Sequence, residues 1–235
     1  EGKFVHEQSL NLGLFSTLTA SASINNVTID ASINLTFPKI VAGTAGENEI
    51  SINSLNGVKT LNFGLLAGEL FGNITNCNVQ GIIVADIANW DDSAFNKTVN
   101  IGGVAGKMSR TIINSTNVPS KITGASTQNS LENPVNVDVS INIKSLLTST
   151  TPSLYQWYVS RLSVGGLVGY ADTMNEISNI TVAASIVVLD ENNNHARGNI
   201  GGAVGKAREA NIASVVAYPF LRGLENVGGI VGYTT

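Results

Sequence analysis

Several kinds of residue are scarce in this sequence, and each shortage excludes a class of protein. The single cysteine, Cys77, rules out an internal disulfide framework. Only 13% of the 235 residues are charged and the net charge is −4, so the sequence lacks the Lys/Arg stripe of a nucleic-acid-binding protein. No apolar run approaches the length of a membrane span. We therefore expect no nucleic-acid partner and no membrane span, and we expect Cys77 to be a buried small residue.

Sequence signatures of catalysis and of metal binding are also missing. The chain has two histidines, and the stretch HEQSL at residues 6–10 lacks the second histidine of a zinc HExxH helix. The acidic stretch DENNN at residues 190–194 begins like a calcium loop, but His195 stands where the turn glycine belongs and Gly201 where the bidentate glutamate belongs. We expect no enzyme activity, no catalytic residue, no cofactor and no metal site. In a β-helical enzyme, the fold would bring the carboxylates together from separate coils.

One stretch, NIGGVAGK at residues 100–107, resembles a phosphate-binding loop because glycines precede a lysine. A P-loop requires a glycine five residues before the Gly-Lys pair and a Ser or Thr after it. Ile101 stands at the glycine position, and Met108 replaces the hydroxyl residue. The stretch therefore does not predict a nucleotide site.

The same glycine-rich stretch recurs along the chain. Copies begin with NLGLF at Asn11, NFGLLAG at Asn62, NIGGVAG at Asn100, SVGGLVG at Ser163, NIGGAVG at Asn199 and NVGGIVG at Asn226. Their first glycines are Gly13, Gly64, Gly102, Gly165, Gly201 and Gly228, at unequal intervals. Such recurrence is the signature of a repeat architecture, with one structural unit per copy and loops of different length between units.

Between the glycine motifs the sequence alternates with period two. Val135, Val137, Val139, Ile141 and Ile143 alternate with polar residues, as expected for a half-buried strand. No window carries the pattern of an amphipathic helix, and one unit is too small to bury its own apolar face. We therefore predict an all-β fold, a β-solenoid of about five coils. It would form one domain over 1–235, with coils at 10–61, 62–99, 100–162, 163–198 and 199–225 and a half-coil at 226–235.

The glycine pairs have a mechanical role in this prediction. Glycine adopts positive φ at a corner, and it lets one backbone layer lie close to the next. Gly102, Gly103 and Gly106 are therefore expected to turn the chain between strands.

The GGLVG motif followed by Ile-x-Asn, cleanest over residues 165–182, resembles the GLUG repeat. GLUG repeats occur in bacterial surface adhesins and in non-catalytic regions of IgA-cleaving metallopeptidases. The resemblance covers residues 62–233 and is looser at the first copy, where Leu14 and Phe15 replace the second glycine and its neighbour. It implies a β-solenoid on an extracellular protein and carries no peptidase activity to this chain.

Six Asn-x-Thr sequons are candidate glycosylation sites: Asn26, Asn34, Asn73, Asn96, Asn114 and Asn179. Their number is close to what a random order of the same residues would give, but all six use Thr rather than Ser. Asn26, Asn114 and Asn179 also take the same place in three copies of the repeat. We expect N-linked glycans on at least some of them, on the outward face of strands. The alternative is that β-branched Thr simply suits strands.

One aromatic cluster, Tyr155, Trp157 and Tyr158, is a candidate contact for a ligand or partner. Exposed, it would be a platform for a surface glycan or a protein. Buried under the segment between Pro119 and Leu162, it would be core.

These observations predict a structural or adhesive segment of an extracellular or cell-surface protein. The last copy stops without the strand that follows the other copies, and solenoid ends expose backbone edge and apolar surface. We therefore expect either a longer chain or end-to-end self-association into a filament. A carbohydrate-binding module and a β-helical carbohydrate-active enzyme are the alternatives.

Overall fold

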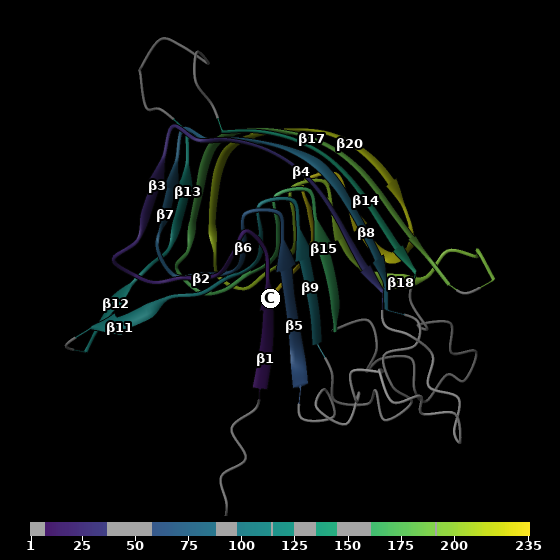
Figure 1. Ribbon diagram of the computed structural model, residues 1–235, viewed down its shortest axis with the longest axis horizontal. Helices are drawn as coiled ribbons and strands as arrows, with labels where there is room; N and C mark the ends of the chain where they lie inside the picture. Colours follow the sequence, from purple (N-terminus) through teal and green to yellow (C-terminus); the bar gives the residue numbers. More distant parts are fainter. Residues whose placement is uncertain are drawn as a thin grey trace, which may run out of the picture.

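The computed structural model describes residues 8–36, 58–87, 98–113, 115–124, 135–144, 161–190 and 192–235. All secondary structure in this part of the chain is β (Figure 1). Accordingly, these residues contain no helix of the length and apolarity needed to cross a membrane.

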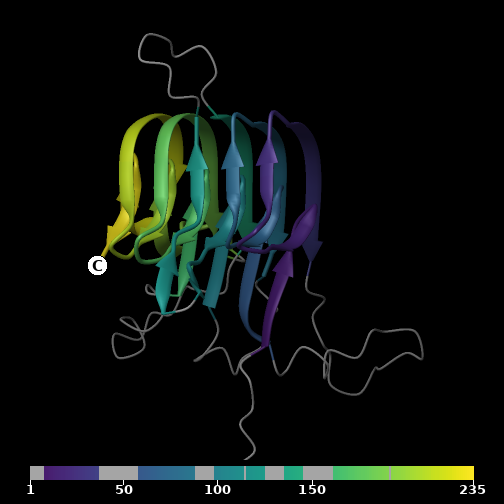
Figure 2. The same cartoon turned by 90° about the vertical axis from the view of Figure 1, so that its left-hand side faces the viewer.

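Six copies of the glycine motif each contribute one strand to a first parallel sheet. Its strands, in spatial order, are β1 (Gln8–Leu12), β5 (Val58–Gly64), β9 (Thr98–Gly102), β15 (Leu162–Gly165), β18 (Arg197–Gly201) and β21 (Leu224–Gly228). The spatial order is the chain order, so each copy lies beside the preceding one. We call the strands contributed by one copy a layer; Figure 2 shows the layers following one another from purple to yellow.

A second parallel sheet begins directly after each glycine bend. Its strands are β2 (Phe15–Leu18), β6 (Ala67–Leu70), β10 (Ala105–Met108), β16 (Val168–Ala171), β19 (Val204–Ala207) and β22 (Val231–Thr234), again in chain order. Strand β10 contacts β5 and β9 of the first sheet, and β16 contacts β9. The first two sheets therefore pack together.

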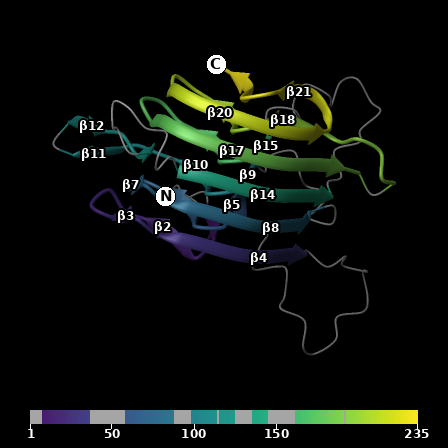
Figure 3. The same ribbon diagram turned by 90° about the horizontal axis from the view of Figure 1, so that it is seen from above.

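The third sheet combines short and long parallel strands. Its short strands are β3 (Ser23–Asn25), β7 (Asn73–Thr75) and β13 (Lys121–Thr123). Its long strands are β4 (Thr28–Thr36), β8 (Asn78–Asp86), β14 (Val135–Lys144), β17 (Glu176–Leu189) and β20 (Asn211–Arg222). Strand β17 pairs first with β13 and then with β14. Seen from above, the long strands run side by side from β4 to β20 (Figure 3). A small antiparallel pair, β11 (Thr111–Ile113) and β12 (Thr116–Val118), projects beside β13 (Figure 1).

The all-β prediction is confirmed, but the predicted β-solenoid of about five coils is wrong. The described strands form several parallel sheets lying side by side, and no solenoid is identified among them. The physical reason is that repetition and alternation specify which segments pair laterally, whereas they leave undetermined the path by which the chain joins one sheet to the next.

Period-two alternation places the core as the sequence predicts. On β14, Val137, Val139, Ile141 and Ile143 are buried, whereas Asp138 and Asn142 between them are exposed. These side chains belong to one continuous apolar cluster that spans the layers, and the buried Cys77 is part of it. Because each layer covers the apolar face of its neighbour, the stack shares one core.

The glycine motif is needed for close approach of backbones. A Cβ on Gly166 would lie 2.2 Å from the carbonyl oxygen of Gly202 in the next layer. A Cβ on Gly169 would lie 2.4 Å from the backbone nitrogen of Ile101 in the first sheet. Among the described glycines only Gly81 has a positive φ, 152°. The expected corner role of Gly102, Gly103 and Gly106 therefore comes from close packing of layers, with no requirement for positive φ.

A ladder of buried amides joins the layers of the first sheet. The register aligns Asn11, Asn62, Asn100, Ser163, Asn199 and Asn226. Asn62 Nδ2 donates to Asn11 Oδ1, and Asn100 Nδ2 donates to Asn62 Oδ1, both at 2.8 Å. Asn226 Nδ2 donates to Asn199 Oδ1 at the same distance. Asn62 is thus donor to the layer before it and acceptor from the layer after it, and Ser163 interrupts the amides between Asn100 and Asn199.

Removing one member of this ladder should destabilise the fold. Asn100→Ala leaves the buried Oδ1 of Asn62 without its donor, and we expect a loss of about 1–3 kcal/mol in the free energy of unfolding. Urea denaturation measures the difference. The control is Asn142→Ala, on the exposed face of β14, for which we expect a change within about 0.5 kcal/mol. Equal effects of the two substitutions would contradict a stabilising ladder.

Candidate functional site

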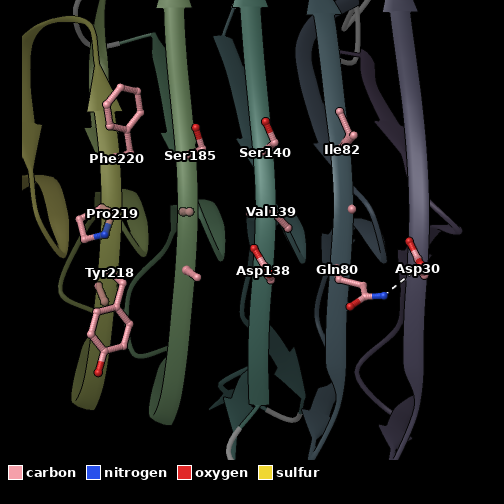
Figure 4. A pocket seen from close by; sticks show the side chains of 14 residues that line it. Asp30, Gln80, Ile82, Asp138, Val139, Ser140, Ser185, Tyr218, Pro219 and Phe220 are labelled. Atoms are coloured by element: carbon pink, nitrogen blue, oxygen red, sulfur yellow. Dashed lines mark hydrogen bonds between the residues drawn. The ribbon is translucent and has the colours of Figure 1, made fainter.

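A shallow open groove lies on the outward face of the third sheet (Figure 4). Its volume is about 890 Å³, and it crosses β4, β8, β14, β17 and β20. Because these strands pair in register, each contributes side chains at the same height along the sheet. The groove is therefore a product of all five layers that reach the third sheet.

Two rows of outward side chains line the groove. The first row is Asp30, Gln80, Asp138, Ala183 and Tyr218, and the second includes Ile82, Ser140, Ser185 and Phe220. Residues between the rows point inward on the alternate face, as strand geometry requires. In the middle of the groove only small side chains stand on β14 and β17, apart from Asp138, so the floor is low there (Figure 4).

An aromatic pair forms one end of the groove. Tyr218 and Phe220 are 67% and 58% exposed, on the same face of β20 with Pro219 between them. Strand β20 is the edge strand of the described sheet, where a proline is tolerated because no ladder donor is lost to a further strand. Two large rings held so openly on a rigid strand form a flat apolar platform.

Acidic and amide groups form the other end. Gln80 Nε2 donates to Asp30 Oδ2 at 2.9 Å, and Asp138 lies on the next strand beside Gln80. The residues that line the groove include no lysine and no arginine. This end therefore presents hydrogen-bond acceptors and negative charge.

Metal chemistry has no support in the described part of the chain, where no group of three or more His, Cys, Asp or Glu residues is arranged around one point. The calcium-like loop closes on itself: Asp190 Oδ1 accepts N–H hydrogen bonds from Asn192 and Asn194, both at 2.8 Å. Burial would raise the pKa of Asp190, but the hydrogen bonds from Asn194 and Asn192 outweigh it and hold the pKa below its usual value. The carboxylate thus serves to shape the turn.

A separate row of polar and aromatic residues, outside the groove, crosses the second sheet. The register aligns Thr17, Glu69, Lys107, Tyr170, Lys206 and Tyr233. Lys107 Nζ lies 3.0 Å from Glu69 Oε1, and Ser109 Oγ donates to the same oxygen at 2.7 Å. Opposite charges thus meet in adjacent layers, which makes this pair part of the framework.

The rest of this row pairs a cation with aromatic rings. Lys206 Nζ lies 5.8 Å from the centre of the Tyr170 ring and 5.6 Å from that of Tyr233. Burial, and then the positive charge of Arg208, lowers the pKa of Lys206. Such cation–π contacts join three layers. They again serve the stacking of the sheet.

An ion pair stands beside Tyr170. Asp172 accepts hydrogen bonds from the Thr173 N–H at 2.7 Å and from Arg208 Nε at 2.8 Å. Burial would raise the pKa of Asp172, but these two partners lower it below the usual value. Burial, and then the nearby carboxylate of Asp172, raises the pKa of Tyr170 to about 12.

The described sequons occupy two kinds of position. Asn26 has a φ of 56°, and the strand register places it beside Asn76, whose φ is 51°. Asn179 has a φ of 57° and lies beside Ser214, whose φ is 52°. Asparagine tolerates this left-handed conformation, so it marks a corner repeated from layer to layer rather than a strand face. Asn34 is exposed on β4, and Asn73 is half-buried on β7. Asn96 and Asn114 lie outside the described residues, as do Tyr155, Trp157 and Tyr158.

The sequence did contain a signal for the groove. Tyr218 and Phe220 are two residues apart in alternating sequence, so they share one face of a strand. Asp30 and Asp138 come into one row only through the register of three strands. Recognising that row requires the repeats to be aligned residue by residue beyond the glycine motif.

Comparison of this chain with known protein families, with curated proteins and with solved structures gave no match. Its function therefore has to be inferred from its own residues.

The raised pKa of Tyr170 predicts a specific sensitivity to alkali. The folded state favours the neutral phenol, so this contribution is complete below pH 10 and is lost as the pH rises through about 12. We expect Tyr170→Phe to lose less stability than the wild type between pH 9 and pH 12, as measured by urea midpoints. Tyr233→Phe, in the same row, is the control and should follow the wild type. Parallel curves for wild type and Tyr170→Phe would refute the prediction.

Proposed function

We propose that this chain is a structural and adhesive segment of an extracellular or cell-surface protein, with no enzymatic role. The observation that carries the proposal is the in-register stacking of six repeats into parallel sheets, which makes a stiff support with a weakly charged surface. The resemblance of the glycine motif to GLUG repeats supports the same class and the same location. N-linked glycans would suit an outward surface rich in Asn and Thr.

The end layers favour assembly of copies end to end. Val227 and Ile230 of the last layer are 41% and 42% exposed, whereas Ile200 and Ala203 at the equivalent positions of the layer before it are buried. The first layer likewise exposes Leu14 and Phe15. A further layer of the same pattern on either edge would bury apolar surface and pair backbone groups.

The polarity of the amide ladder is compatible with this assembly. Where hydrogen bonds join the asparagines of neighbouring layers, the later residue donates to the earlier one, as Asn62 does to Asn11 and Asn226 to Asn199. The Nδ2 group of Asn11 donates to Thr17 Oγ1 and Glu69 Oε2 of its own copy, so Asn11 of a second copy would exchange one of these bonds to donate to Asn226 of the first. Head-to-tail stacking thus continues the hydrogen-bond direction.

A hydrolytic role is the alternative, because a carbohydrate-active enzyme would use two carboxylates across a cleft. Asp30 and Asp138 face the same groove, but β8 separates their strands by about 10 Å. Gln80 lies between them and binds Asp30. This arrangement favours ligand recognition over hydrolysis.

End-to-end association can be measured directly. We expect the wild-type chain to form larger species with rising concentration in sedimentation velocity, and linear particles in electron micrographs. Ile230→Lys places a charge on the last layer and should keep the chain monomeric, because a buried unpaired charge is costly.

The control for this experiment is Val84→Lys. Val84 is 38% exposed, close to the 42% of Ile230, but it lies on the outer face of the third sheet. We expect this variant to associate like the wild type. A wild-type chain that stays monomeric at the highest concentration reached would refute end-to-end assembly.

The glycosylation proposal has a separate test. When the chain is secreted from eukaryotic cells, we expect glycosidase treatment to lower its mass, and Asn34→Gln to remove one glycan because Asn34 is exposed. Asn73→Gln is the matched control at a half-buried sequon. It should leave unchanged the mass that glycosidase treatment removes from the secreted chain. A secreted chain whose mass does not respond to glycosidase would contradict this part of the proposal.

A further inference from the structure

The aromatic pair at the groove has no role in the stacking of the layers. Tyr218 and Phe220 point outward from β20, away from the shared core. The equivalent outward positions on β17 are Ala183 and Ser185, and those on β14 are Asp138 and Ser140. Small or polar residues at these outward positions are therefore compatible with the stacking of the layers. Two exposed rings in one layer call for an explanation outside the framework.

The groove lining combines the groups that recognise sugars. Flat aromatic rings pack against the apolar C–H faces of sugar rings, and Tyr218 and Phe220 offer such a surface. Sugar hydroxyls donate and accept hydrogen bonds, for which Gln80, Ser140 and Ser185 are suitable partners. The carboxylates of Asp30 and Asp138 accept bonds from hydroxyl groups.

The shape of the groove indicates an extended ligand. It crosses five strands, so its ends are about 19 Å apart at the usual strand spacing. It is open along its length, and its floor is low on β17, where Ala183 and Ser185 stand beside the aromatic strand β20. A linear oligosaccharide lying across the strands would contact both the aromatic and the acidic end, whereas a single sugar would reach only one.

Charge and backbone pairing exclude the other common ligands. Asp30 and Asp138 line the groove without a lysine or arginine, which disfavours nucleic acids and acidic polysaccharides. An added peptide strand needs unpaired backbone groups, but β8, β14 and β17 each pair on both sides. The floor of the groove therefore offers side chains alone.

We propose that this outer groove binds an uncharged linear glycan, with sugar rings stacked on Tyr218 and Phe220 and hydroxyls bonded to Asp30, Gln80 and Asp138. The proposal deepens the adhesive role proposed above by naming a ligand class. It does not depend on end-to-end association.

The test uses calorimetric titration of the whole chain with cellohexaose, maltohexaose and laminarihexaose, and with polygalacturonate as the anionic probe. We expect at least one uncharged hexasaccharide to bind and polygalacturonate not to bind. Tyr218→Ala and Phe220→Ala should each weaken binding about three- to tenfold, the effect of losing one stacking contact.

Tyr233→Ala is the matched control, because it truncates an exposed ring of the last layer on the second sheet. It should bind like the wild type, and melting curves establish that each variant is folded. The titration is repeated in Ile230→Lys: binding retained there while assembly is lost would separate the groove from end-to-end association. Absence of binding by all three hexasaccharides, binding of polygalacturonate alone, or equal losses in Tyr218→Ala and Tyr233→Ala would overturn the proposal.

Discussion

Lateral stacking of equivalent residues is the constraint on which the rest of this structure depends. In a parallel sheet built from repeats, each side chain meets its own counterpart in the next layer. Asparagine suits this arrangement because its amide is both donor and acceptor, as between Asn62 and Asn100. Residues of like charge do not suit this arrangement, because they repel each other when they lie directly opposite. The chain accordingly holds only 13% charged residues, and Glu69 stacks on Lys107 rather than on a second glutamate.

The sequence predicted the features that recur in every layer, but it did not predict the path of the chain between the sheets. Alternation identified Val137 and Ile141 as core, and the glycine motif identified the points where backbones approach. Lateral pairing alone does not determine how a chain passes between sheets, so the solenoid prediction failed where the all-β prediction held. The sequence also did not show why asparagine recurs at Asn26 and Asn179. An asparagine with left-handed φ at a corner and an asparagine on the outward face of a strand give the same residue pattern.

The outer groove lies where repetition is broken. Inward positions carry similar residues in every layer, because each must fill the same core. At the first outward row of the groove the layers instead carry Asp30, Gln80, Asp138, Ala183 and Tyr218. Part of this variation is explained by pairing between layers, as Gln80 pairs with Asp30, but the exposed Tyr218 beside Ala183 is not and meets another requirement. Ligand recognition is such a requirement, since it needs different groups at different points along the groove.

Assembly and ligand binding involve neighbouring layers: Ile230 belongs to the last layer, and Tyr218 lies on β20 of the layer before it, which is the last to reach the third sheet. If a second copy stacks its β1 and β2 on β21 and β22, its β4 with Asp30 lies two layers from β20, about 10 Å away. A glycan long enough to cross this gap would contact the grooves of both copies. Linked sites bind with an avidity above that of either site, without any new contact. A stiff parallel framework favours this effect because it holds the successive grooves in line.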